Sequence, residues 1–290
     1  MYTKRASFTI GLVIMLIIGM SLLLYPSLSN YWNSRVQSKA LAGYLDEIAI
    51  MDEDKYEEVW NAAIAYNEAL LARDNQYILP AEMQARYNEV LNVGGTGIMG
   101  YVDIPTINVN LPLYHGTSEK VLQVAIGHLN WTSIPAGGPN THCVISGHRG
   151  LPSARLFTDL DKLIVGDYFM IHVLGETMTY EVDQIRIVTP SEAEELLIQE
   201  GKDLFTLVTC TPYGINSHRM LVRGHRVENL EDTKEIRITA DAMVVEKLLV
   251  MPFVLLPILL VMLVFLLIST RKPKVSIQQE TKNLDDRRNP

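Results

Sequence analysis

Two long uncharged stretches, one near each end, constrain what this 290-residue chain can fold into. Residues 8–24 and 248–268 contain no Asp, Glu, Lys or Arg, and about 20 apolar residues span the hydrocarbon core of a bilayer. The second stretch is predicted to be a transmembrane helix in spite of its two prolines, which such helices tolerate. The first could be a cleaved signal peptide, but no small-x-small site follows it closely. We therefore expect an uncleaved membrane anchor.

The cations that flank these stretches predict the orientation of the chain. They precede the first stretch and follow the second, at Lys4, Arg5, Arg271, Lys272 and Lys274. Both ends are then cytoplasmic, and segment 26–247 lies outside with 17 basic against 30 acidic residues, a net charge of −13. This balance argues against nucleic acid as a partner, because nucleic-acid binders usually present a basic face. The alternative is two unrelated anchors around a cytoplasmic domain.

The first part of the segment between the two stretches is predicted to be helical, over residues 32–93. Within residues 56–74, apolar side chains recur every three or four positions and acidic side chains occupy the other face. A second, shorter helix is expected over residues 80–92, with Pro80 in its first turn. The polar residues 73–79 between the two helices are expected to form a loop.

The chain changes character near Asn92 and becomes rich in strand-like sequence. Between residues 98 and 227, seven short apolar runs alternate with Gly and Pro turns, and brief helices are expected at 120–128 and 190–201. This spacing predicts a mainly β domain, a barrel or a sandwich. The expected divisions are the cytoplasmic tip and anchor, the helical segment, the β domain, a juxtamembrane segment, the transmembrane helix and a cytoplasmic tail, at residues 1–25, 26–93, 94–230, 231–247, 248–269 and 270–290.

Candidate chemistry is concentrated in residues 204–227. Strand-like composition ends at Cys210, a Thr-Pro-Tyr-Gly turn follows, and a second strand begins at Arg219. Side chains alternate along strands, so Arg219 lies across from Cys210 if the two faces coincide. A cation beside a thiol favours the thiolate and can stabilise an oxyanion, which indicates a cysteine nucleophile. Taken singly, Cys210 could equally be a buried small apolar residue, and Arg219 a surface ion-pair partner.

A cysteine nucleophile needs an acid–base partner, usually a histidine. His148 follows an apolar strand in a Gly-His-Arg-Gly turn, which would place its imidazole at a strand mouth, and His218 is the second candidate. His142, Cys143, His148 and Cys210 could be considered as metal ligands, but their spacing matches no zinc pattern. The two cysteines could also form a disulfide, although nothing in the sequence requires one.

Three motifs resemble the sortase family, and most closely its class C, pilin-polymerising group: DIPTINVNLPLYHG, ISGHRGLPSARLFTDLDKL and TLVTCTPYGINSHRMLVRG. The helical segment and the two apolar stretches also fit that group. The resemblance implies an eight-stranded β-barrel and a cysteine transpeptidase on the outer face of a Gram-positive cell membrane. From their positions in these motifs, the resemblance implies that His148, Cys210 and Arg219 are catalytic. It also implies that Cys143 is a packed strand residue and that His218 supports the structure.

The resemblance also implies the reaction and its partners. A class C sortase cleaves an LPxTG-like sorting signal between Thr and Gly through a thioester and transfers it to a lysine of a pilin subunit, with no metal or cofactor. The alternatives are a cell-wall-anchoring sortase that uses a peptidoglycan amine, net hydrolysis by water, and a non-catalytic scaffold that docks pilins. The second apolar stretch favours the pilin type, because housekeeping sortases usually have only the N-terminal anchor.

The chain departs from the class C pattern in one place. Class C sortases typically carry a lid before the barrel, whose Asp-Pro-Trp/Phe motif plugs the active site. The corresponding residues here are 73–79, where Asp74 and Tyr77 could replace the Asp and the aromatic residue, but the proline is absent and the spacing differs. The resemblance therefore leaves open a lid with a weaker plug or an open site.

Overall fold

The computed structural model of the chain describes residues 2–229, 259 and 262–263. The expected transmembrane helix at 248–268, apart from those three residues, and the segments on either side of it lie outside the described part. Residues 2–25 belong to one compact unit and residues 26–229 to another.

The N-terminal apolar stretch lies in α1 (Tyr2–Ala49), a 48-residue helix. Within the described residues, one helical span is long and apolar enough to cross a membrane: Gly11–Ala49, with a mean hydropathy of 2.2 in an 18-residue window. By length and composition this span is consistent with a membrane anchor near the N-terminus.

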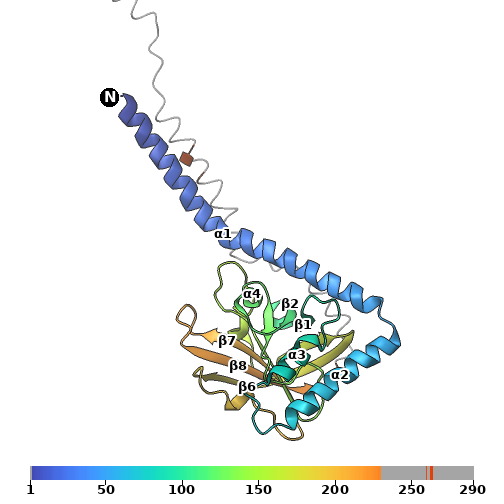
Figure 1. The fold of residues 1–290 in the computed structure, drawn as a ribbon. Helices are drawn as coiled ribbons and strands as arrows, with labels where there is room; N and C mark the ends of the chain where they lie inside the picture. The colour runs from blue at the N-terminus through green and yellow to red at the C-terminus, as the bar shows by residue number, and fades with distance from the viewer. Residues whose placement is uncertain (1, 230–258, 260–261, 264–290) are drawn as a thin grey trace, which may run out of the picture. The chain divides into compact units, whose positions relative to one another are not determined.

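Two further helices precede the β domain, as the periodicity predicts. α2 (Glu53–Leu71) begins at Asp52, whose side chain accepts a hydrogen bond from the Lys55 backbone N–H at 2.8 Å, and its buried face includes Ala63, Tyr66 and Leu70. α3 (Ala81–Glu89) follows Pro80. Both helices contribute side chains to the main apolar core and lie against the barrel (Figure 1).

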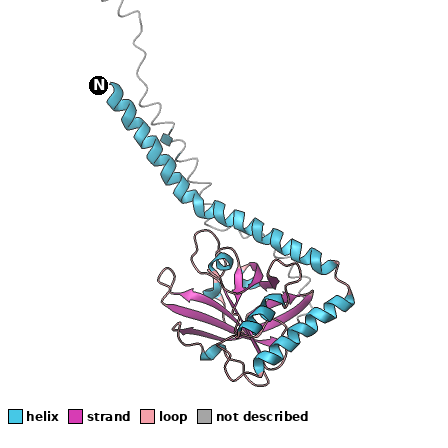
Figure 2. Cartoon of the chain, in the orientation of Figure 1, coloured by secondary structure: helices cyan, strands magenta, loops and turns pink. Residues whose placement is uncertain are grey.

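Residues 98–227 form a closed barrel of eight strands in the order β1-β2-β3-β4-β7-β8-β6-β5 (Figure 2). In chain order the strands are β1 (Ile98–Ile104), β2 (Val109–His115), β3 (Ile126–His128), β4 (Thr141–Ser146), β5 (Tyr168–Val173), β6 (Glu176–Val188), β7 (Asp203–Thr211) and β8 (His218–Val227). The connections contain α4 (Glu119–Leu122) and the 3-10 turns η1 (Pro105–Ile107), η2 (Leu160–Lys162) and η3 (Glu194–Leu196). The eight-stranded barrel expected from the resemblance is therefore present.

The predictions of the two brief helices are mostly wrong. In place of a helix over 120–128, α4 has four residues and the chain then enters β3, which pairs in parallel with β2 and antiparallel with β4. In place of a helix over 190–201, only η3 forms. In both places tertiary contacts override local helix propensity, because β3 is needed to join β2 to β4 and close the barrel.

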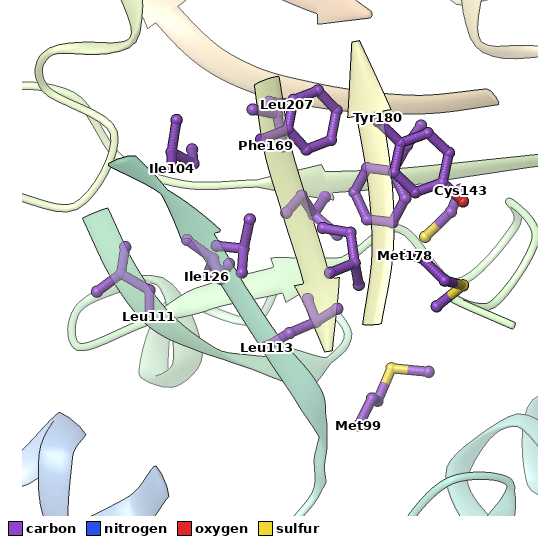
Figure 3. Close-up of a cluster of buried hydrophobic side chains, with 14 of the residues drawn as sticks. Met99, Ile104, Leu111, Leu113, Ile126, Cys143, Phe169, Met178, Tyr180 and Leu207 are labelled. Atoms are coloured by element: carbon purple, nitrogen blue, oxygen red, sulfur yellow. The ribbon is translucent and has the colours of Figure 1, made fainter. Parts of the chain in front are cut away.

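The barrel wall has apolar side chains on both faces. The inner face forms the main core, which includes Phe169, Cys143 and Leu207 (Figure 3). On the other side of the wall, a separate group is here named the outer cluster, consisting of Val144, Val188, Leu196, Val208 and Leu221, with Leu129 and Trp131 packed against it. Strand alternation explains this arrangement, since members of the outer cluster alternate along β4, β7 and β8 with core residues.

Candidate active site

The register of three neighbouring strands brings His148, Cys210 and Arg219 to one end of the barrel. β4 and β7 run parallel, with Ser146 opposite Val208, and β8 runs antiparallel to β7, with Arg219 opposite Cys210. His148 stands two residues beyond Ser146, and Cys210 stands two residues beyond Val208. Cys210 and Arg219 are therefore cross-strand neighbours, and His148 follows the adjacent strand at the same end of the barrel although it is distant from both in the sequence.

Cys210 lies on the outer face of the wall. It alternates in phase with Val208 of the outer cluster, so its side chain continues the same face, and it is a free, half-buried thiol. Arg219 is in phase with Leu221 on the same face. The side chains of the outer cluster form an apolar strip along this face, and the nucleophile expected from the sequence is accessible at the end of that strip.

The second cysteine is placed differently. Cys143 is 3% exposed in the main core, and burial raises the pKa of its thiol well above the usual value. It is also free, so the two cysteines form no disulfide. Cys143 has the environment of a packed strand residue.

The backbone just before His148 is held to β7 through both the N–H and the carbonyl of one residue, Gly147. The Gly147 N–H donates to the Val208 carbonyl at 3.1 Å, and the Thr209 hydroxyl donates to the Gly147 carbonyl at 2.8 Å. A Cβ on Gly147 would stand 2.8 Å from the Phe157 ring, so only glycine fits there. The loop that carries His148 therefore starts from a fixed position beside the strand that carries Cys210.

Arg219 and His218 have distinct surroundings. The Arg219 guanidinium donates to the carbonyls of Asn216 and His218, at 3.2 and 3.1 Å, which fixes it in the β7–β8 loop. His218 pairs with Thr211, one position out of phase with Cys210, and its Nδ1 lies 2.8 Å from the Ser217 hydroxyl. The alternation of the strand therefore directs His218 away from the face of Cys210, which favours His148 as the acid–base partner.

Buried histidines elsewhere in the barrel have structural roles. His142 Nδ1 lies 2.9 Å from the Leu197 carbonyl and its Nε2 lies 2.7 Å from the Thr206 hydroxyl, and burial lowers the pKa of His142 to about 4. Because this ring is neutral and fully bonded, it anchors the β6–β7 loop that contributes Leu196 to the outer cluster. Within the described part of the chain, no group of three or more His, Cys, Asp or Glu side chains is arranged to hold a metal.

Residues 73–79 form a loop that lies against the β6–β7 loop and Trp131. The Tyr77 ring lies 5.2 Å from the Trp131 ring, centroid to centroid, and the Gln76 amide oxygen accepts from the Ile198 N–H at 3.2 Å. A cavity of about 450 Å³ separates parts of the two loops. Tyr77 therefore contacts the aromatic ring at the edge of the outer cluster, whereas Asp74 is exposed.

The apolar strip beside Cys210 could not be identified as a unit from the sequence. Its members come from β4, β6, η3, β7 and β8, and Leu196 belongs to a segment for which the sequence predicts a helix. The strand alternation of Val208 and Leu221 was a usable signal, but nothing local places Trp131 beside them. Arg149, next to His148, was also not singled out, although its side chain reaches the strand of Cys210.

Comparison with known proteins gives consistent results. A model of the sortase domain matches residues 102–227. Sortase C1 from Streptococcus agalactiae is 53% identical and superposes with a TM-score of 0.65 over 66% of this chain and 100% of that chain. Sortase C of Streptococcus pneumoniae is 44% identical (TM-score 0.59, 66% and 97% covered). Sortase C of Clostridium perfringens is 40% identical (TM-score 0.59, 66% and 100% covered).

The family match falls within the barrel. The chain spans 63% of the length of a curated sortase to which it is 30% identical over 131 residues. A sequence identity of 53% over the whole of a solved class C sortase, together with the closed eight-stranded barrel, shows the relationship directly. The chain belongs to the sortase family.

Proposed function

We propose that this protein is a membrane-anchored cysteine transpeptidase that joins pilin subunits through LPxTG-like sorting signals. The observation that carries the proposal is the register of β4, β7 and β8, which sets Cys210 opposite Arg219 and places the loop of His148 next to the end of β7. A nucleophile, a neighbouring acid–base group and a fixed cation are the parts that acyl transfer needs.

The reaction has two halves. The Cys210 sulfur attacks the carbonyl carbon of the Thr residue in the signal, and His148 takes the thiol proton and gives it to the departing Gly amine. The Thr–Gly bond breaks and a thioester remains. His148 then removes a proton from a lysine amine of a second subunit, which attacks the thioester, releases Cys210 and forms an isopeptide bond.

Arg219 acts on the charge that develops in both halves. Each attack places negative charge on the carbonyl oxygen, and a guanidinium held by two loop carbonyls needs little reorganisation to stabilise it. The apolar strip of the outer cluster leads to Cys210 and offers a surface for the apolar residues of the signal. The names of two relatives support this substrate class: the pneumococcal structure concerns pilin substrate specificity, and the clostridial one includes a C-terminal cell wall sorting motif.

Residues 73–79 act as a lid in this proposal. The contact of Tyr77 with Trp131, which packs against the outer cluster, supports this role, since the loop and a bound signal would compete for the same apolar surface. Asp74 is exposed and takes no part in this contact, and its role as the Asp of the class C motif stays a prediction. The catalytic domain faces outward, as the flanking cations predict.

Intact-mass spectrometry of the full chain in detergent micelles tests the proposal. With an LPxTG-type peptide we expect an acyl adduct that disappears when a lysine-bearing pilin domain is added, together with a peptide–pilin isopeptide product. The adduct should be absent in Cys210→Ala and retained in Cys143→Ala, the matched control. An adduct that is resolved only by water or by a peptidoglycan amine contradicts pilin transfer. Fibre assembly that persists in Cys210→Ala contradicts catalysis and favours a scaffold.

A further inference from the structure

We propose that Arg149 is a positioning residue that holds the loop of His148 against the end of the strand that carries Cys210. The proposal rests on the proposed function, since it assigns a task to a neighbour of the acid–base histidine. Arg149 itself touches neither the thiol nor the substrate; it acts by fixing where His148 can lie.

The Arg149 side chain links three elements. Its Nη1 donates to the hydroxyl of Thr211, the residue after Cys210, at 3.4 Å, and its Nη2 pairs with the carboxylate of Asp161 in η2. The loop that follows β4, the end of β7 and η2 are therefore joined through one guanidinium. The contact on β7 falls directly beside the nucleophile.

This arginine is placed unlike an ordinary surface cation. Its side chain is 10% exposed, and its Nε is buried without a hydrogen bond in the described part of the chain. Removing a guanidinium from water is unfavourable unless good geometry offsets it, so a buried position indicates a geometric task. The same loop contains a comparison: Arg155 pairs with Asp159 four residues on, and its side chain is 40% exposed.

The loop is fixed on both sides of His148. Before it, Gly147 is bonded to β7 through its N–H and its carbonyl, and the His148 carbonyl accepts from the Phe157 N–H at 3.1 Å. After it, Gly150 adopts a positive φ of 75°, and the Tyr213 ring lies 2.9 Å from where a Cβ on Gly150 would be. Arg149 adds a second side-chain link between the loop and β7, beside that of the Thr209 hydroxyl, so the imidazole retains only its own rotations.

The consequence is a defined separation between imidazole and thiol. Proton transfer between them needs a hydrogen-bonded approach, and a displacement of about 1 Å can cost 10²-fold in rate. We therefore expect Arg149→Met to lower kcat for peptide cleavage by roughly 10- to 100-fold. KM should change little, because Arg149 is not part of the apolar strip.

The test uses the full chain in detergent micelles and two readouts. The first is kcat and KM for cleavage of an LPxTG-type peptide by Arg149→Met, Arg149→Lys, Thr211→Val and the control Arg155→Met. The second is the rate of Cys210 alkylation by iodoacetamide from pH 5 to 9, which needs no substrate. A lysine reaches only one partner as a point charge, so Arg149→Lys should retain part of the activity, and Arg155→Met should resemble the wild type.

A double-mutant cycle of Arg149 and His148 distinguishes a role in positioning His148 from a role in stabilising the fold. If Arg149 acts through His148, the alkylation profile of Arg149→Met moves to that of His148→Ala, and the double variant is no slower than His148→Ala alone. Additive effects, a wild-type profile in Arg149→Met, or an equal loss of kcat in Arg155→Met would overturn the proposal. If Arg149→Met does not fold, Arg149→Lys and Thr211→Val decide it by the same profile.

The two proposals fail in different ways. If the wild type forms no peptide adduct, the proposed function fails, but the alkylation cycle still reports whether Arg149 places His148 beside Cys210. If the wild type is active and the cycle is additive, only the role of Arg149 is lost.

Discussion

Cys143 and Cys210 are the same residue type on paired strands of one barrel wall, yet their environments are opposite. Cys143 pairs with Phe205 on the core face, whereas Cys210 is in phase with Val208 on the outer face. The two thiols therefore differ in burial, because successive side chains of a strand point to opposite faces of the barrel wall.

This difference predicts selective alkylation. In the native chain iodoacetamide should modify Cys210 alone, since Cys143 is buried and its pKa is raised by burial. In about 6 M guanidinium chloride, which unfolds the chain, both thiols should react. Intact mass gives the number of adducts and peptide mapping gives their position. Native modification of Cys143 at a comparable rate would contradict the buried placement.

Buried histidines predict a loss of stability in acid. Burial lowers the pKa of His128 to about 3 and of His142 to about 4, from a usual value of 6.5, so both rings are neutral in the folded chain. In the unfolded chain these rings take up protons below pH 6.5. Their contribution to the free energy of unfolding is therefore fully present above that pH and is lost as the pH falls toward the pKa of the folded state. At pH 5 the loss is at most about 2 kcal/mol for each ring.

Urea unfolding at pH 7 and pH 5 measures this effect. His142→Gln should be less stable at pH 7 and should lose roughly 1–2 kcal/mol less than the wild type between the two pH values. His225→Gln, at an exposed position of β8, should keep the wild-type pH dependence. An unchanged pH dependence in His142→Gln would show that the ring is not held neutral by burial.

At the scale of elements, two loops contribute side chains at the outer cluster or beside it: Leu196 from the β6–β7 loop, and Tyr77, which contacts Trp131. The loop of residues 73–79 is bonded across its own ends, because the Arg73 guanidinium donates to the Ile78 carbonyl at 2.6 Å. It is also bonded to the β6–β7 loop, since the Gln76 side chain accepts from the Ile198 N–H. The β6–β7 loop is in turn fixed to the barrel by His142. Among the described residues, residues 73–79 therefore contact the rest of the domain through the Tyr77 and Trp131 rings and through Gln76.

Weakening that contact should increase peptide cleavage. A pair of aromatic rings contributes roughly 0.5–1.5 kcal/mol, so Tyr77→Ala should raise kcat/KM by about 2- to 10-fold, mainly through a lower KM. Deletion of residues 73–79 should raise it at least as much. Initial rates with an LPxTG-type peptide provide the measurement.

The control for the lid is a neighbour in the same loop. The Ile78 side chain is 67% exposed, so Ile78→Ala should leave the rate near that of the wild type. If Tyr77→Ala and the deletion both turn over at the wild-type rate, the loop does not compete with the substrate and the site is open.

At the scale of the whole molecule, the second half of α1 is part of the catalytic unit. The Tyr44 hydroxyl donates to the Met99 carbonyl in β1 at 3.1 Å and accepts from the Leu174 N–H between β5 and β6 at 2.9 Å. Asn33 and Gln37 donate to the carbonyls of Ser153 and Val124. Chain segments that are distant in sequence are thus joined to one helix beside the barrel.

Tyr44→Phe should destabilise this unit although the ring is retained. Tyr44 is 4% exposed, so the substitution leaves a buried N–H and a buried carbonyl without their partner, which costs about 1–3 kcal/mol. Urea unfolding of the full chain measures the loss, with Tyr31→Phe on an exposed part of the same helix as the control. Equal stabilities of the two variants would mean that α1 does not support the barrel.

Local sequence was sufficient to predict much of this protein. Periodicity predicts α2 and α3, composition predicts seven of the eight strands, and strand parity predicts that Cys210 faces Arg219. These features depend on neighbouring residues, and local preferences and alternation are written directly in the chain. The motifs around His148, Cys210 and Arg219 extend them to a family and to a candidate site.

Other features were decided only by tertiary structure. β3 is three residues long and lies in a run with helical character, and it exists because it bridges β2 and β4. The contact of Tyr77 with Trp131 and the link from Arg149 to Thr211 join segments whose separation in sequence carries no local signal. The physical reason is that pairing and burial between distant segments outweigh local propensity, and that they are determined only when the barrel closes.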